Sequence, residues 1–198
     1  MKKISFRIEP FAPAGLFLLF FSWEPVPRAA VMISVLVHEL SHLAAAKLCG
    51  ERVQSISITA FGIALGFSPP HSYGEEAFVA SSGPAASFAL AALGRARGGA
   101  FGGEVFIFSL FLGLLNLLPL ASFDGNRILT SLCSLAFGER AAHAVASAVS
   151  YAFLFLAWVV SVYILFYSGA NFALLLFCAY IFVFTVVKKD CNSRKNVV

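Results

Sequence analysis

Val37-His38-Glu39-Leu40-Ser41-His42-Leu43 lies inside a mostly apolar, helix-forming run at residues 31–48. Residues four apart share one face of a helix, so His38 and His42 are placed to hold one metal ion between two imidazole rings. Glu39 is placed to reach a water molecule at the metal rather than the metal itself. Zinc is the predicted ion, because imidazole suits it and a catalytic zinc site uses three protein ligands and an open position. The alternative is a pair of core histidines that happen to fall four residues apart.

The composition places this helix in a membrane. Of the 198 residues, 60% are hydrophobic and 12% are charged, and 22 are phenylalanine. A soluble domain carries about twice that charged share, so a soluble zinc protease is excluded. We predict an all-α polytopic membrane protein, forming a single membrane-embedded domain over residues 1–198. Its core is expected at residues 29–129, with a short basic tail at residues 188–198.

Six apolar segments are expected to span the membrane, at residues 11–23, 29–48, 77–93, 104–120, 141–167 and 170–187. The first is short, because a full crossing takes about 20 residues. A Gly/Arg-rich loop is expected at residues 94–103, and a mildly amphipathic helix from residue 127 to about residue 137. The bilayer is therefore the first partner that the sequence predicts.

The net charge of +4 fits this topology. Basic residues in a membrane protein mark cytoplasmic ends, so the charge does not indicate a nucleic-acid surface. With six spans and both termini in the cytoplasm, eleven of the 14 Lys and Arg residues lie on the cytoplasmic side. Arg28, Arg95 and Arg97 are the exceptions. We therefore predict that both termini are cytoplasmic.

Residues 53–67 follow a different pattern. Ile56, Ile58 and Ala60 alternate with Ser55, Ser57 and Thr59, which is the period-two pattern of a β-strand. We predict a small β-hairpin or sheet after the second span, with an ordinary interfacial loop as the alternative. Non-helical backbone at membrane depth must be buried in protein or line a wet cavity, so a hairpin here implies a cavity near the metal helix.

A catalytic zinc site needs a third ligand, and Asp124 is the first candidate. The chain has only two aspartates, and the other, Asp190, lies in the tail. An ionisable residue close to the membrane interior needs a partner, and zinc is a suitable one. Gly125 permits a tight turn that would aim the carboxylate inward. The alternatives are that Asp124 caps the following helix, or that His71 or His143 supplies the ligand.

Three motifs together resemble a known family. They are His38-Glu39-x-x-His42 in the second span, Gly83-Pro84 in the third, and Asn116-x-x-Pro119 with a downstream Asp124-Gly125. In this combination the chain is similar to the site-2 protease family of intramembrane zinc metalloproteases, peptidase family M50, over about residues 29–129. The compact six-span form is most similar to the branch that includes the stage IV sporulation protease, which activates a sigma factor.

The resemblance implies a role for each motif residue. His38, His42 and Asp124 bind one zinc ion, Glu39 is the catalytic base, and Asn116 helps to hold the substrate backbone. The implied activity is hydrolysis of peptide bonds in or near transmembrane segments of membrane-tethered proteins, such as a single-span protein or a sigma-factor precursor. The implied location is the bacterial cytoplasmic membrane, with regulatory membrane proteins as further partners.

Two departures from the family pattern stand out. Many members read Asp-Gly-Gly where this chain has Asp124-Gly125-Asn126, and no regulatory CBS domain follows the expected sixth span. Nucleotide sensing is therefore not expected. Two other functions remain open: a catalytically silent relative that binds transmembrane helices, and a small metal or proton transporter. The transporter class often shows internal repeats, and this sequence has none.

Overall fold

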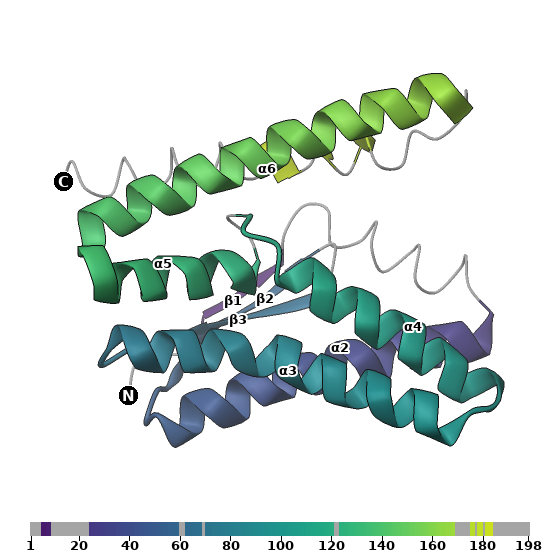
Figure 1. The fold of residues 1–198 in the computed structure, drawn as a ribbon. Helices are drawn as coiled ribbons and strands as arrows, with labels where there is room; N and C mark the ends of the chain where they lie inside the picture. The colour runs from purple at the N-terminus through teal and green to yellow at the C-terminus, as the bar shows by residue number, and fades with distance from the viewer. Residues whose placement is uncertain are drawn as a thin grey trace. The chain divides into compact units, whose positions relative to one another are not determined.

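The computed structural model of the chain describes residues 5–8, 24–59, 62–68, 70–120, 123–168, 175–176, 178–179 and 181–183. The chain divides into two compact units, Met1–Leu117 and Leu118–Val198, and each is described here by itself. Four helices are long and apolar enough to span a membrane: α2 (Pro25–Leu48), α3 (Tyr73–Arg97), α4 (Gly99–Asn116) and α6 (Glu139–Ser168) (Figure 1). They point to an integral membrane protein and coincide with four of the six expected spans. The expected span at 11–23 lies outside the described residues, and the one at 170–187 lies largely outside them.

Helix α2 has well-defined ends. Pro25 occupies its first turn, where the missing N–H has no intrahelical partner to lose. At the other end Gly50 has φ +76°, its N–H donates to the Lys47 carbonyl, and the Glu51 N–H donates to the Ala46 carbonyl at 2.8 Å. This pair of bonds around a left-handed glycine is a Schellman motif, which satisfies the last carbonyls of the helix. The histidine motif thus lies on a helix that is terminated on both sides.

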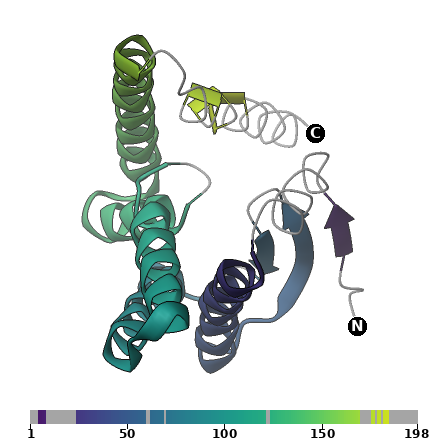
Figure 2. The ribbon, with the colours of Figure 1, turned by 90° about the vertical axis from the view of Figure 1, so that its right-hand side faces the viewer.

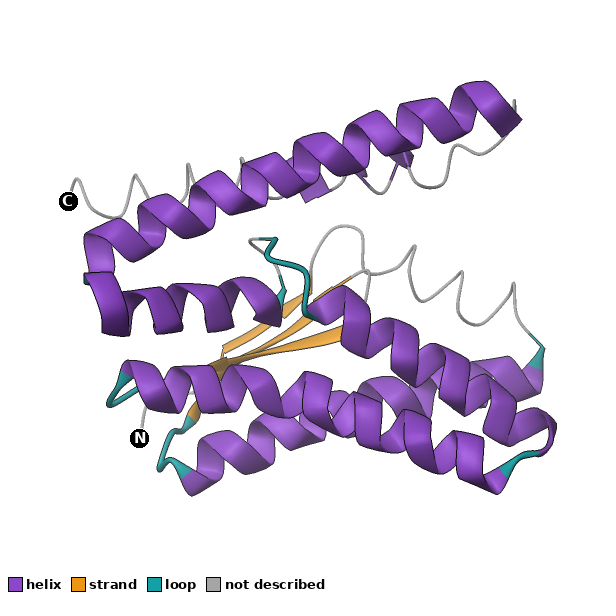
Figure 3. Cartoon of the chain, in the orientation of Figure 1, coloured by secondary structure: helices purple, strands orange, loops and turns teal. Residues whose placement is uncertain are grey.

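The predicted hairpin is present, as strands β2 (Val53–Thr59) and β3 (Gly62–Phe67) in antiparallel pairing. A third strand, β1 (Ser5–Ile8), pairs in parallel with β2, with Ser5 opposite Ser55. The sheet order is β1-β2-β3, and Figure 3 shows the strands in orange. The sequence did not reveal β1, because four residues are too few to show a period-two pattern. Strand β2 is therefore paired on both sides, and β3 has one unpaired edge among the described strands.

Helix α3 is longer than the span expected at residues 77–93. At its start the hydroxyl of the N-cap residue Ser72 accepts a hydrogen bond from the Glu75 N–H at 3.2 Å. The Glu75 carboxylate in turn accepts one from the His71 N–H at 3.0 Å. The Ser-x-x-Glu spacing at 72–75 is the sequence signature of such a start. The helix therefore starts at Tyr73, four residues before the start of the predicted span.

The expected Gly/Arg-rich loop at residues 94–103 is wrong. Only Gly98, with φ +68°, separates α3 from α4. Gly94 and Gly102 lie inside the two helices, where a Cβ on Gly94 would stand 2.8 Å from the Gly102 carbonyl oxygen. These glycines allow the helix backbones to approach closely, as small residues do at membrane helix interfaces. The glycine cluster therefore reflects packing rather than a long loop.

Helix α2 is central in the first unit. It contacts α3, α4 and β3, and Figure 2 shows it between the sheet and the α3–α4 pair. The buried residues of α2 are three alanines and the polar residues Ser34, His38 and His42. Ser34 and Ser109 hydroxyls are hydrogen-bonded at 2.8 Å across α2 and α4, and the Ser34 hydroxyl donates to the Ala30 carbonyl. Because that uses the Ser34 proton, Ser109 is the donor to Ser34.

Replacing Ser109 by alanine tests the strength of this interhelical bond. We expect the free energy of unfolding to fall by about 0.6 kcal/mol, the mean measured for hydrogen bonds between membrane helices, and by no more than about 1.7 kcal/mol, the largest value measured. The Ser34→Ala, Ser109→Ala double variant should be little worse than either single variant, because the two hydroxyls share one bond. Reversible unfolding in mixed micelles measures the coupling. Fully additive losses would contradict the shared bond.

The second unit contains α5 (Asp124–Phe137) and α6, joined at Gly138 with φ +82°. The two helices pack against each other, and Figure 1 shows α6 running back along α5. The expected helix at 127–137 is confirmed, although it starts three residues earlier. Asp124, Gly125, Ser131 and Ser134 are buried on α5, whereas Leu132, Leu135 and Phe137 are exposed.

Candidate metal centre

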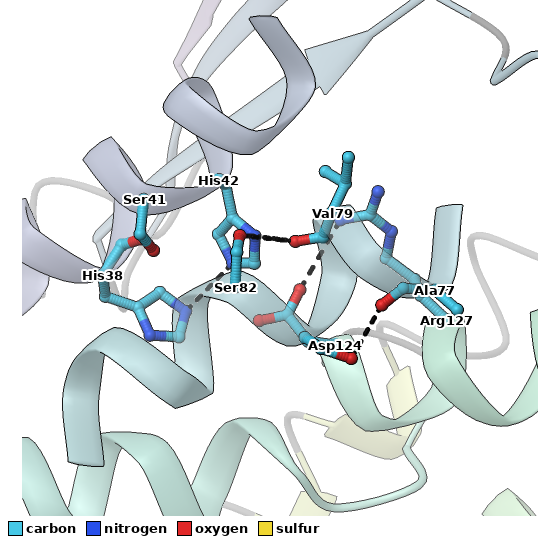
Figure 4. A network of polar contacts seen from close by, with 9 residues as sticks. His38, Ser41, His42, Ala77, Val79, Ser82, Asp124 and Arg127 are labelled. Atoms are coloured by element: carbon cyan, nitrogen blue, oxygen red, sulfur yellow. Dashed lines mark hydrogen bonds and ion pairs between the residues drawn. The ribbon is translucent and has the colours of Figure 1, made fainter. Parts of the chain in front are cut away.

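His38 and His42 project from one face of α2 toward each other (Figure 4). Their Nε2 atoms lie 3.3 Å apart, and both side chains are buried, at 3% and 4% exposure. The ring planes are nearly perpendicular, at 80°. The i, i+4 spacing therefore brings two nitrogen ligands to a single point, as the sequence predicted.

The main chain of α3 fixes the orientation of His42. Its Nδ1 lies 2.8 Å from the Val79 carbonyl oxygen. A carbonyl accepts hydrogen bonds and cannot donate them, so Nδ1 carries the proton and Nε2 presents a lone pair. The Ser82 hydroxyl donates to the same Val79 carbonyl at 2.7 Å, which leaves its oxygen as an acceptor 3.4 Å from His42 Nδ1 (Figure 4). Both neighbours therefore select the tautomer that binds a metal through Nε2.

His38 is held by a hydroxyl instead. Its Nδ1 lies 2.9 Å from the oxygen of Ser87, which is completely buried on α3. A hydroxyl either donates or accepts, so this contact supports His38 in either tautomer. The Nδ1 atom of each imidazole thus contacts a group on α3. For His42 this group is a carbonyl, and for His38 it is a hydroxyl.

Gly83 provides the space for both rings. A Cβ at this position would overlap His42 Nε2, and would lie 2.6 Å from His42 Cε1 and 2.8 Å from His38 Cε1. The next residue, Pro84, lies inside α3, where it has no N–H to offer the helix. Glycine is therefore required at residue 83, because any side chain there would displace the imidazoles.

The two histidines fit a zinc ion in both distance and chemistry. Nitrogen ligands at about 2.0–2.1 Å from a tetrahedral ion lie roughly 3.3–3.4 Å apart. The observed separation of the Nε2 atoms is 3.3 Å. Outer hydrogen bonds on both Nδ1 atoms are the usual arrangement for metal-binding imidazoles. The alternative of two unrelated core histidines does not account for this convergence.

Glu39 and Asn116 lie at different places in the first unit. Glu39 follows His38 on α2 and is half-buried. Asn116 is the last residue of α4, and its Nδ2 donates to the Leu112 carbonyl at 3.0 Å. This bond is the local one that a helix-end asparagine makes. No described residue bonds the Asn116 Oδ1, so its acceptor and its second N–H remain available.

Asp124 is buried in the second unit, in the first turn of α5. The N-cap of that helix is Phe123, without a side-chain cap bond, so the alternative that Asp124 caps the helix is wrong. The expected tight turn at Gly125 is also wrong, because Gly125 lies within the helix and lacks a positive φ. The Asp124 Oδ1 lies 3.5 Å from Nη1 of Arg127.

Asn126 stands where many members of the similar family have a second glycine, and its side chain makes a contact that glycine could not make. The single proton of the Ser150 hydroxyl on α6 is shared between two acceptors, the Pro119 carbonyl oxygen at 2.6 Å and the Asn126 Oδ1 at 3.1 Å. The amide thus ties the first turn of α5 to α6 and to the segment before it. A second glycine at residue 126 would lack this bond.

The other two histidines differ from the motif pair. His71 and His143 are exposed, and His143 Nε2 lies 3.9 Å from the Glu139 carboxylate. The sequence reasoning overlooked the three α3 residues that surround the imidazoles: Val79, Ser82 and Ser87. The Gly83-Pro84 pair inside an otherwise helical pattern was a signal for their position, because such a pair costs helix stability and is retained for packing or function.

Comparisons with known proteins include a match to a family model and a match to a solved structure. Residues 100–160 match the model of peptidase family M50. The fold is similar to that of the site-2 protease from Methanocaldococcus jannaschii, with a TM-score of 0.71 and 19% sequence identity over 95% of this chain and 92% of that chain. Among curated proteins, none matches the sequence. The structural match establishes a site-2 protease fold, and the family match covers α4, α5 and most of α6.

Proposed function

We propose that this chain is an intramembrane zinc metallopeptidase that hydrolyses peptide bonds in or near transmembrane segments of membrane-tethered proteins. The observation that carries the proposal is the convergence of two buried imidazole nitrogens at 3.3 Å within an apolar helix. The match to peptidase family M50 supports it separately, because residues 100–160 do not include the histidine motif. The site-2 protease fold is the third line of support.

One zinc ion per chain would be held by His38, His42 and Asp124. The support is that all three are buried and that each offers one ligand atom, two imidazole nitrogens and a carboxylate oxygen. Two nitrogens and one carboxylate are a common donor set of catalytic zinc sites. When bound, zinc supplies Lewis-acid chemistry, which activates water at neutral pH and polarises a carbonyl group.

Glu39 acts as the general base in this proposal. It takes a proton from the attacking water and later delivers it to the leaving amine. Its support is its position next to His38, half-buried on the metal-facing helix. A carboxylate at this position is not needed as a metal ligand in this proposal, and its role is to transfer protons.

The substrate is bound in an extended form, because a helix shields its own carbonyls from attack. Among the described strands β3 lies at one edge of the sheet, and it contacts α2, so an unwound substrate segment would add to it as a further strand. Asn116 binds the backbone of the same segment through its Oδ1 and its second amide N–H. Single-span proteins and sigma-factor precursors are the proposed substrates, with regulatory membrane proteins as partners.

The proposed location is the bacterial cytoplasmic membrane, with both termini in the cytoplasm. Four apolar helices support a membrane location, and the distribution of Lys and Arg supports the orientation. Fusion of a reporter to each terminus tests the orientation directly.

Cleavage in membranes tests the function. The chain is co-expressed with tagged single-span substrates that include a sigma-factor precursor and a clipped anti-sigma factor. Wild type is compared with Asp124→Asn and with Asp190→Asn, which changes the other aspartate. We expect Asp124→Asn to lower zinc affinity by at least about tenfold, because the amide keeps an oxygen but lacks the charge. The rate of cleavage by Asp124→Asn should fall together with its zinc affinity. Asp190→Asn should have the zinc affinity and the cleavage rate of wild type.

Zinc content separates the remaining outcomes. One zinc ion in wild type, with lower occupancy in Asp124→Asn, supports the metal site even when no substrate in the panel is cut. A wild-type protein that binds no zinc would contradict the proposal and favour the catalytically silent relative. Metal-dependent flux in proteoliposomes without proteolysis would favour the transporter.

A further inference from the structure

Ser150 of α6 contacts the chain on both sides of Asp124. The Ser150 side chain is buried, and its hydroxyl proton is shared between the Pro119 carbonyl oxygen at 2.6 Å and the Asn126 Oδ1 at 3.1 Å. Pro119 precedes Asp124 by five residues, and Asn126 follows it by two. A single hydroxyl from another helix therefore brackets the segment that carries the buried carboxylate.

The contact to Pro119 replaces a bond that the backbone does not make. In a continuous α-helix the Pro119 carbonyl would accept the N–H of Phe123, four residues later. That N–H donates instead to the Leu120 carbonyl at 2.9 Å. The proline itself favours such a break, because the residue before a proline avoids the helical conformation. Ser150 thus supplies a donor to the Pro119 carbonyl at the point where the chain leaves the helical path.

The contact to Asn126 ties down the first turn of α5. The N-cap of this helix, Phe123, makes no side-chain cap bond, although a side chain at the N-cap commonly satisfies the first turn. Arg127 lies 3.5 Å from the Asp124 carboxylate, but both residues belong to the start of α5 and move with it. The Ser150 hydroxyl comes from α6, so it fixes this turn against a second helix.

Removing the hydroxyl would loosen both contacts at once. The Pro119 carbonyl would lose this donor, and a polar group that loses its partner costs free energy until the chain shifts to find another. The amide of Asn126 would lose its link to α6 at the same time. Because Asp124 lies between the two acceptors, a shift of either one would change the direction of its carboxylate.

We propose that Ser150 is a positioning residue that holds the Asp124 carboxylate in the direction required of a third zinc ligand. A metal site accepts ligand distances only within about 0.2 Å, so a small movement of this turn would weaken the site while all three ligands remain in the chain. The inference rests on the proposed role of Asp124 as a zinc ligand, but it does not depend on cleavage.

A double-mutant cycle tests whether Ser150 acts through Asp124. Competition with a chromogenic chelator measures the zinc affinity of Ser150→Ala, of Asp124→Asn and of the variant that combines them. We expect Ser150→Ala to lower zinc affinity by about tenfold, the lower end of the usual cost of losing an outer partner of a metal ligand. In the Asp124→Asn background it should cause no further loss, because the ligand that it positions has already been changed.

The visible spectrum of the protein loaded with Co²⁺ gives a second readout. Cobalt accepts nitrogen and oxygen ligands, and its coordination geometry is diagnostic of the ligands present. We expect the spectrum of Ser150→Ala to shift toward that of Asp124→Asn, whereas a general loss of stability would leave the spectrum of the folded protein unchanged. Ser161→Ala is the matched control, because it removes another buried hydroxyl of α6, one that donates to the Trp158 carbonyl. Its spectrum and zinc affinity should equal those of wild type.

The outcomes separate this inference from the proposed function. If Asp124→Asn weakens zinc binding but Ser150→Ala has wild-type affinity, the inference is wrong and the ligand assignment stands. An equal loss from Ser150→Ala in both backgrounds would also overturn it, since Ser150 would then act independently of Asp124. Wild-type zinc affinity in Asp124→Asn would contradict both the ligand assignment and the inference.

A second variant covers the case in which Ser150→Ala does not fold. Asn126→Ala then takes its place in the cycle, because it removes one acceptor and leaves the Ser150 contact to Pro119 intact. Its zinc affinity should fall by a smaller factor than that expected for Ser150→Ala, and only when Asp124 is present. Wild-type affinity in Asn126→Ala would overturn the inference in that case.

Discussion

Replacing Glu39 by glutamine is expected to lower peptide cleavage by a factor of about 10²–10⁴, the usual contribution of a general base. The amide has nearly the shape of the carboxylate but cannot accept the water proton at neutral pH. Zinc should stay bound, because His38 and His42 keep their 3.3 Å separation and their α3 partners. The measurement is cleavage of a tagged substrate in membranes, together with the zinc content of the purified protein.

The control for this variant is Glu104→Gln, which changes another half-buried glutamate, on α4. It should cleave at the wild-type rate. If Glu39→Gln still processed substrate at that rate, Glu39 would not be the base. Loss of zinc together with cleavage would instead assign Glu39 a role in forming the metal site.

Adding a single methyl group at Gly83 should have an effect of similar size. The Cβ of Gly83→Ala would overlap His42 Nε2 and stand 2.8 Å from His38 Cε1. The His42 ring cannot rotate without breaking its hydrogen bond to Val79. Helix α3 cannot move aside easily, because it packs closely against α4 at Gly94 and Gly102. A displacement of about 1 Å in a site can cost a factor of about 10² in rate. We therefore expect cleavage to fall at least about 100-fold and zinc to be lost.

Gly103→Ala is the matched control for Gly83→Ala. Gly103 also lies inside a membrane helix, but a Cβ there would meet nothing within 4 Å. This variant should retain zinc and activity, because alanine is the better helix former. Competition with a chromogenic chelator measures zinc affinity in both variants. Wild-type affinity in Gly83→Ala would show that the two rings tolerate a large shift.

Local patterns in the sequence predicted the features that depend on local geometry. The i, i+4 spacing of His38 and His42 predicted their convergence, and alternation at residues 53–67 predicted the hairpin. An amphipathic pattern located α5, and a long apolar run located α6. These features follow from the fixed repeats of helix and strand, so neighbouring residues are sufficient to predict them.

Features that depend on contacts between distant segments were missed. Glycines at residues 94–103 indicated a loop, whereas Gly94 and Gly102 serve the approach of two helices. Ser87 looked like one small residue among many, although its hydroxyl bonds His38, which is 49 residues away in the sequence. A periodic pattern records which face of a helix is buried, but it does not record which side chain faces it across the interface.

The parallel pairing of β1 with β2 has a consequence for the order of folding. Ser5 lies opposite Ser55, so β1 leaves the ribosome before its partner and stays unpaired with β2 until α2 and β2 have also been made. Contacts of such long sequence separation require closure of a long loop before they yield any stabilisation. The sheet beside the metal helix should therefore assemble after α2 has inserted, and hydrogen exchange during synthesis should show β1 as the last of its strands to gain protection.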